Sequence, residues 1–133
     1  MKKLIVVNEN LNLKALDVDE HNFRSILSQT FPNFTNSVKT QKMVDFFNRT
    51  DIVMLTHDLF TSNMELNLIG TALYSGDYDY AIAGEIAFAK EVLNHEFESN
   101  LVGLDINDID RDIYNGLVNF CDYMKEQIAD VER

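Results

Sequence analysis

The strongest constraint on the fold is an apolar repeat in the last part of the 133-residue chain. Apolar residues recur there at steps of three and four: Ile106, Ile109, Ile113, Leu117, Phe120, Met124, Ile128 and Val131. This spacing matches the 3.6-residue period of an α-helix and predicts a long amphipathic helix that begins near Asp105. Its apolar stripe must be covered, either by the rest of the chain or by another copy.

Two further helices are predicted in the second half of the chain. Residues 64–74 carry apolar side chains at helical spacing and end at a Ser-Gly pair. A second helix is expected to begin at Asp77 or Asp79 and to run to residue 98. Its middle, residues 81–89, is apolar on almost every side, which is typical of a central helix that is covered all round.

The first half of the chain predicts short strands and two more helices. Residues 3–7 and 51–55 are apolar and rich in β-branched residues, which indicates buried strands that could pair in parallel. Helices are expected from Asp17 or Asp19 to residue 29 and over residues 40–47. The predicted fold is a single domain over residues 1–133, of the α+β class and mostly helical, with five helices and a small two-strand element near the N-terminus.

Charge is distributed unevenly along the chain. The formal net charge is −11; residues 1–66 contribute −1 and residues 67–133 contribute −10. Direct binding to nucleic acid or to an anionic membrane needs a cationic surface, so both are excluded as expected partners. The chain has one cysteine, Cys121, and neither a secretory apolar segment nor a membrane span is recognisable. We therefore expect a cytoplasmic protein.

A polar stripe runs opposite the apolar repeat of the last predicted helix. Asp108, Asp112, Asp122 and Glu126 share this stripe with two asparagines. Acidic residues near the C-terminal end of a helix face the negative end of its dipole, so Asp122 and Glu126 break a local rule. We take these four residues as candidate partner contacts, and Asp105, Asp110, Asp77 and Asp79 as secondary ones. The alternative interpretation is a solvated face without a partner.

The acidic stripe predicts a basic partner surface. Carboxylates one helical turn apart are separated by about 6 Å, which is similar to the phosphate spacing along a nucleic-acid strand. The hypothesis is a small regulator or inhibitor that mimics nucleic acid, as acidic phage proteins with an anti-defence role do, and that blocks a nucleic-acid-binding protein of a host or a phage-defence system. No enzymatic activity and no cofactor are expected.

Two alternatives come from other classes of function. His21 together with His57-Asp58 is similar to the His and His-Asp pattern of HD-type metal phosphohydrolases. That similarity implies a divalent metal held by these side chains, completed by Asp105 or Asp108. The other alternative is a helical oligomerisation module, in which the apolar stripe of the last helix forms a homodimer.

Overall fold

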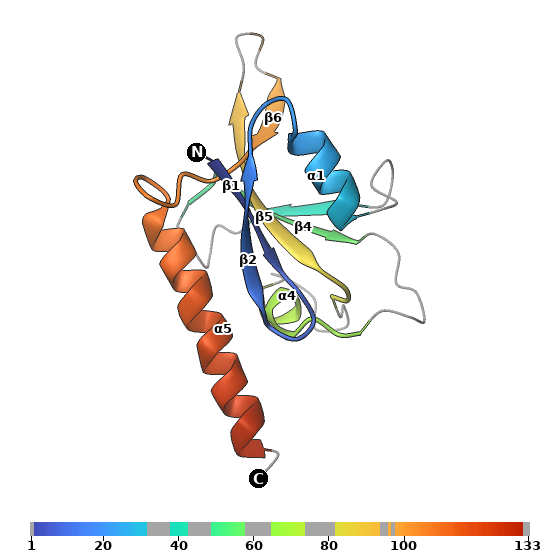
Figure 1. Ribbon diagram of the computed structural model, residues 1–133, viewed down its shortest axis with the longest axis vertical. Helices are drawn as coiled ribbons and strands as arrows, with labels where there is room; N and C mark the ends of the chain where they lie inside the picture. Colours follow the sequence, from blue (N-terminus) through green and yellow to red (C-terminus); the bar gives the residue numbers. More distant parts are fainter. Residues whose placement is uncertain are drawn as a thin grey trace.

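The computed structural model describes residues 2–31, 38–42, 49–57, 65–73, 82–93, 96 and 98–131. Within these ranges the chain forms strands and helices in the following order (Figure 1): β1 (Lys2–Val7), β2 (Leu13–Val18), α1 (Phe23–Thr30), β3 (Val38–Lys42), β4 (Ile52–His57), α4 (Leu68–Leu73), β5 (Ile86–Leu93), β6 (Ser99–Val102) and α5 (Arg111–Val131).

The strands form one antiparallel sheet in which β5 is central. The order of hydrogen-bonded strands is β2-β1-β5-β4-β3, and β6 also pairs with β5. One edge of β5 pairs with β4; the other edge pairs first with β1, through Ile86–Phe88, and then with β6, through Lys90–Leu93. The sheet therefore divides at one end, where the chain that follows β6 meets β1 through a bridge between Lys3 and Leu104.

The mostly helical fold class predicted from the sequence is wrong. The described residues contain six strands in one sheet and the three helices α1, α4 and α5, so the molecule is rich in sheet. The two expected strands do exist, as β1 and β4, but they do not pair with each other. Each pairs antiparallel to β5, which lies between them.

The largest error in the predicted fold concerns the apolar residues 81–89. They are predicted to form a central helix, whereas residues 86–89 belong to strand β5. A strand covered on both faces is apolar at every position, and over a short run this pattern is the same as that of a fully buried helix. From Ile86 to Lys90 every residue is buried. The alternating side chains reach opposite cores: Ile86 and Phe88 pack on one face, whereas Ala87 and Ala89 pack on the other.

The other predicted helices were correct only in part. The helix expected from Asp17 or Asp19 is preceded by β2 and is confined to α1. The start of the helix expected over residues 40–47 belongs to β3, and residues 43–48 lie outside the described ranges. The helix expected over 64–74 is reduced to α4. The long C-terminal helix is confirmed as α5, which begins at Arg111 after a run of turns.

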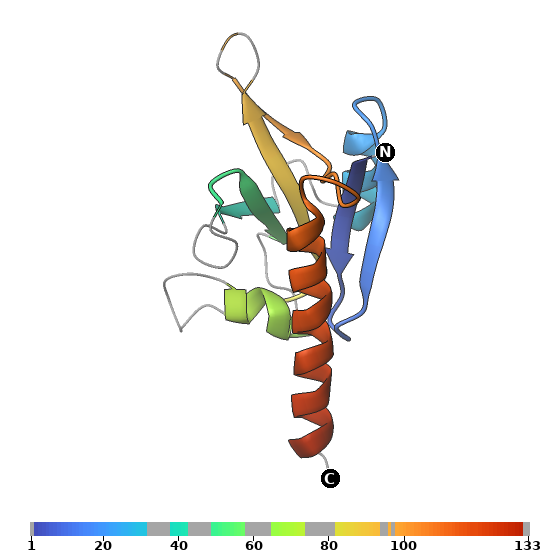
Figure 2. The same cartoon turned by 90° about the vertical axis from the view of Figure 1, so that its left-hand side faces the viewer.

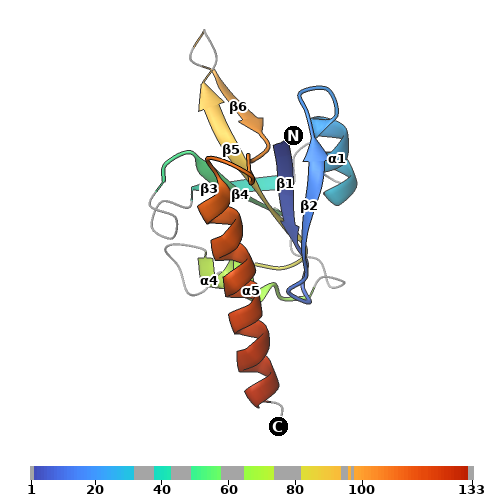
Figure 3. The same cartoon turned by 60° about the vertical axis from the view of Figure 1, so that its left-hand side comes forward.

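Helices cover both faces of the sheet. In Figure 2, α5 passes in front of the sheet, and α1 lies behind the β1–β2 pair. Ile113, Leu117 and Cys121 of α5 are buried in the larger core, and Leu27 of α1 is buried in the smaller one. The last turns of α5 extend past the end of the sheet (Figure 3). Within the described residues, no helix combines the length and the apolarity that crossing a bilayer requires.

Candidate functional site

The acidic face of α5 is the surface formed by Asp112, Asp122 and Glu126, preceded by Asp108 in the adjoining turn. All four residues are exposed. At 3.6 residues per turn, the three helical positions point away from the buried residues Ile113, Leu117 and Cys121. The packing that buries the apolar stripe therefore directs this acidic face to solvent, along about 21 Å of helix between Asp112 and Glu126.

The two basic residues of α5 do not neutralise this face. Arg111 donates a hydrogen bond from Nη2 to the carbonyl oxygen of Asn107 (2.7 Å), and Lys125 donates from Nζ to Oδ1 of Asn12 (3.2 Å). Among the described residues, no lysine or arginine lies within ion-pair distance of the four acidic side chains. Within the part of the chain that the structure describes, these carboxylates thus have no ion-pair partner.

The helix dipole affects the two ends of the acidic face differently. Asp112 lies in the first turn of α5, where a negative charge is favourable. Glu126 lies near the opposite end, and the last turn holds no basic residue. The carboxylates of Asp122 and Glu126 are one turn apart and repel each other by a few tenths of a kcal/mol. The C-terminal half of the face therefore carries charge that does not stabilise the helix.

A second group of charged residues lies at the N-terminus of α5 and is buried in part. Its centre is Asp110, whose side chain has no exposed surface. Nη1 of Arg49 lies 2.8 Å from Oδ1 of Asp110, and Nζ of Lys90 lies 3.1 Å from Oδ2. The N–H of Asp105 donates to the same Oδ2 at 2.7 Å. Arg49 also forms a bidentate pair with Asp51, with distances of 2.9 Å and 2.6 Å.

These contacts shift the pKa values of the two acids in this group, Asp110 and Asp51. Burial alone would raise the pKa of Asp110, but the N–H of Asp105 and the cations Lys90 and Arg49 outweigh it and lower the pKa. The hydrogen bond from Arg49 lowers the pKa of Asp51, and the same bond raises the pKa of Arg49. These shifts favour the charged forms of Arg49, Asp51 and Asp110. Together with Lys90, the three residues connect the segment before β4, strand β5 and the turn before α5.

Of the four secondary candidate residues, Asp105 and Asp110 lie within the described ranges and contact each other. Asp110 is removed from the candidate surface because its carboxylate is enclosed, while Asp105 beside it is half-buried. Asp77 and Asp79 lie outside the described residues. One sequence signal could have placed Asp110 correctly: it precedes Ile113 by three positions and Leu117 by seven, so it falls on the buried side of the helix.

The histidines of the metal hypothesis lie in dissimilar surroundings. The side chain of His21 is 86% exposed and lies 3.7 Å from the equally exposed Glu20. His57 ends β4, packs edge-on against Phe31 and lies 3.4 Å from Glu85. Asp58 is outside the described ranges. Within those ranges, no group of three or more His, Cys, Asp and Glu side chains is arranged to hold a metal ion. Burial raises the pKa of the Cys121 thiol.

Comparison with known proteins identifies no relative. No family model matches this chain, and neither a curated protein nor a solved structure matches it.

Proposed function

We propose that this protein is a binding regulator or inhibitor, not an enzyme, and that the acidic face of α5 contacts a basic surface on a partner protein. The observation that carries the proposal is the separation of charges around α5. The cations Arg49 and Lys90 are used internally by Asp51 and Asp110, and those of α5 itself bind backbone and amide oxygens. No lysine or arginine of the described residues is therefore paired with the acidic face.

A rigid helix is a suitable carrier for such a face. Its carboxylates are held in one row before the partner arrives, so less conformational entropy is lost on binding than with a flexible acidic tail. The uncompensated charge also increases the rate of encounter with a basic surface, and it disfavours wrong partners that carry negative charge.

The partner class we propose is a nucleic-acid-binding protein of a host or of a phage-defence system, bound in the cytoplasm. The nucleic-acid-binding cleft of such a partner is basic. It binds phosphates at a spacing close to the distance between carboxylates one helical turn apart. The acidic face would then occupy the position of nucleic acid. The net charge of −11 disfavours nucleic acid itself and anionic membranes as partners.

The test is affinity capture from lysate, with the wild-type protein as bait at about 50 mM and about 500 mM salt. We expect a nucleic-acid-binding protein at the lower salt only, and we expect a DNA or RNA duplex to displace it from the bait. A partner that is retained equally at both salts, or that the duplex does not displace, contradicts the proposal.

A bait with reversed charges tests whether the residues of the acidic face of α5 bind the partner. Asp112→Lys combined with Asp122→Lys should abolish capture while leaving the circular dichroism spectrum unchanged, because both side chains are exposed. The free energy of unfolding should change by no more than about 1 kcal/mol, through the altered interaction of residue 112 with the helix dipole. The matched control is Glu20→Lys combined with Glu65→Lys, which changes the net charge equally at exposed positions outside α5. If both double variants lose the partner to the same extent, net charge and not the acidic face of α5 is responsible.

A further inference from the structure

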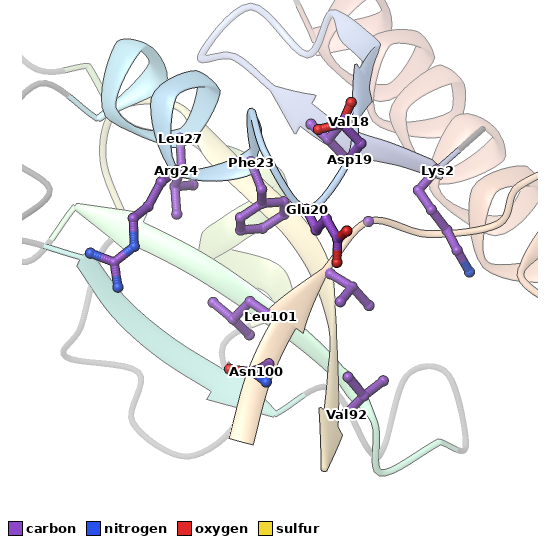
Figure 4. Close-up of a pocket in the computed structure, with 12 residues that line it drawn as sticks. Lys2, Val18, Asp19, Glu20, Phe23, Arg24, Leu27, Val92, Asn100 and Leu101 are labelled. Carbon is purple, nitrogen blue, oxygen red and sulfur yellow. The ribbon is translucent and has the colours of Figure 1, made fainter. Parts of the chain in front are cut away.

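A cavity of about 680 Å³ lies between α1 and the end of the sheet at which β6 separates from β1 (Figure 4). Its apolar lining includes Val18, Phe23, Leu27, Val92 and Leu101. Its volume falls within the range of pockets that bind ligands, about 300–1,000 Å³. The acidic face of α5 takes no part in this cavity.

The outer edge of β6 opens into this cavity. Asn100, Leu101 and Val102 are consecutive residues whose side chains point alternately to the two faces of the sheet, yet all three line the cavity. A cavity that touches both faces of a strand at successive residues must enclose its edge. The opposite edge of β6 is occupied by its pairing with β5.

The strand register shows which backbone groups lie on the open edge. The N–H of Glu91 donates to the carbonyl oxygen of Asp51, so Glu91 faces β4. Its cross-strand neighbour Leu101 is then the non-hydrogen-bonded position of the β5–β6 pair. The N–H and C=O of Leu101 therefore point away from β5, and they meet no backbone partner among the described residues.

The charges at the ends of the cavity differ. Figure 4 shows Arg24 at one end and Lys2 at the other, with Glu20 and Asp19 on the Lys2 side. Among the described residues, no carboxylate lies within ion-pair distance of Arg24. At the Lys2 end, Gly103 lets the chain approach closely: a Cβ there would lie 2.5 Å from Cγ2 of Val18.

We propose that this cavity binds an extended peptide segment of a partner protein by adding it as a strand to the open edge of β6. The peptide backbone pairs with the N–H and C=O of Leu101, an apolar side chain contacts Phe23, and an acidic side chain lies at the Arg24 end. This recognition mode uses main-chain hydrogen bonds for affinity and alternate side chains for specificity. It is independent of the binding function proposed for α5.

The first experiment selects a displayed library of random twelve-residue peptides against the wild-type protein. We expect enriched sequences with alternating apolar residues and an acidic residue at one end. The variant Arg24→Glu should weaken their affinity by roughly tenfold or more. The control Lys14→Glu, which makes the same charge change at an exposed position of β2 outside the cavity, should leave affinity unchanged.

A second pair of variants isolates the backbone contact. Leu101→Pro removes the outward N–H, which no bond to β5 uses, whereas Leu101→Ala shortens the side chain and keeps that N–H. The proline variant should bind the selected peptide at least about tenfold more weakly than the alanine variant. Amide hydrogen exchange provides a measurement that needs no variant: the Leu101 N–H should exchange rapidly in the free protein and slowly in the complex.

Several results would overturn the proposal. These are a selection that enriches no peptide, equal affinity of the proline and alanine variants, or a Leu101 amide whose exchange the peptide does not slow. Binding of a small apolar anion such as dodecanoate at this cavity, without binding of any peptide, would show a small-molecule pocket instead.

Discussion

Asp110 and Asp112 are two residues apart, yet they belong to regions with opposite physical roles. Asp110 lies in the buried cluster at the start of α5, where Arg49, Lys90 and the N–H of Asp105 surround its carboxylate. Asp112 lies on the exposed acidic face, and no lysine or arginine of the described residues is within ion-pair distance of it. Identical chemical groups thus pair with cations inside the protein in one region and face solvent in the other. The difference is set by the direction in which the helix points each side chain.

The largest effect is expected from removing the buried charge of Asp110, which tests the proposed difference between the two aspartates. Asp110→Asn leaves Lys90 buried without its counter-charge, so we expect the free energy of unfolding to fall by about 3–5 kcal/mol. Asp112→Asn is the matched control, and it should change stability by no more than about 0.5 kcal/mol. Urea unfolding of both variants measures the difference. Equal effects would show that Asp110 is not part of a stabilising cluster.

Lowering the pH should remove the contribution of Asp110 and Asp51 to the stability of the wild-type protein. The pKa values of Asp110 and Asp51 are lowered in the folded protein. Their contribution is therefore complete above the ordinary carboxyl pKa, about 4, and is lost as the pH falls through the lowered folded-state values. The stability difference between wild type and Asp110→Asn should be largest near neutral pH and should narrow below about pH 4. A difference that stays constant down to about pH 2 contradicts this assignment.

A smaller effect is expected where α4 meets β5, away from both charged regions. A Cβ at Gly70 would lie 2.7 Å from Cγ2 of Ile82 and 3.1 Å from Cγ2 of Ile86. Gly70→Ala should therefore destabilise the protein by about 1–3 kcal/mol through overpacking. Partner binding should be unchanged, because the acidic face is not touched. A thermal unfolding curve that matches wild type would mean that this contact relaxes without cost.

The smallest effect is expected from a variant that changes the stability of α5 without changing the proposed binding residues. A Cβ at Gly116 meets no atom within 4 Å, so Gly116→Ala should stabilise the helix by about 0.5–1 kcal/mol. The acidic face keeps its residues, so affinity for the partner should remain equal to that of wild type. A large change in affinity would indicate that binding depends on the stability of the helix and not on the carboxylates.

Sequence patterns predicted α5 well and predicted the rest of the fold poorly, for a physical reason. A helix that packs on one side only shows its period in its own residues, as Ile113 and Leu117 do. β5 is covered on both sides, so its apolar run contains no period that separates strand from helix. The pairing of β5 with three strands is a long-range property that no local pattern contains.

The candidate sites divide in a similar way. The exposure of Asp112, Asp122 and Glu126 follows from helical period alone, and it was predicted. The partners of Asp110 come from β5 and from the residues before β4, so their approach depends on the folded sheet. The cavity beside β6 was not predicted either, because it depends on where β6 leaves the sheet.

The most direct measurement of the central claim is the affinity of the captured partner for two double variants, by titration calorimetry. Asp112→Lys with Asp122→Lys alters the acidic face, and Glu20→Lys with Glu65→Lys alters net charge elsewhere. We predict that the first pair weakens binding by about a hundredfold or more and that the second pair changes it by less than about threefold. Wild-type affinity for the first pair would contradict the claim that the acidic face of α5 is the binding surface.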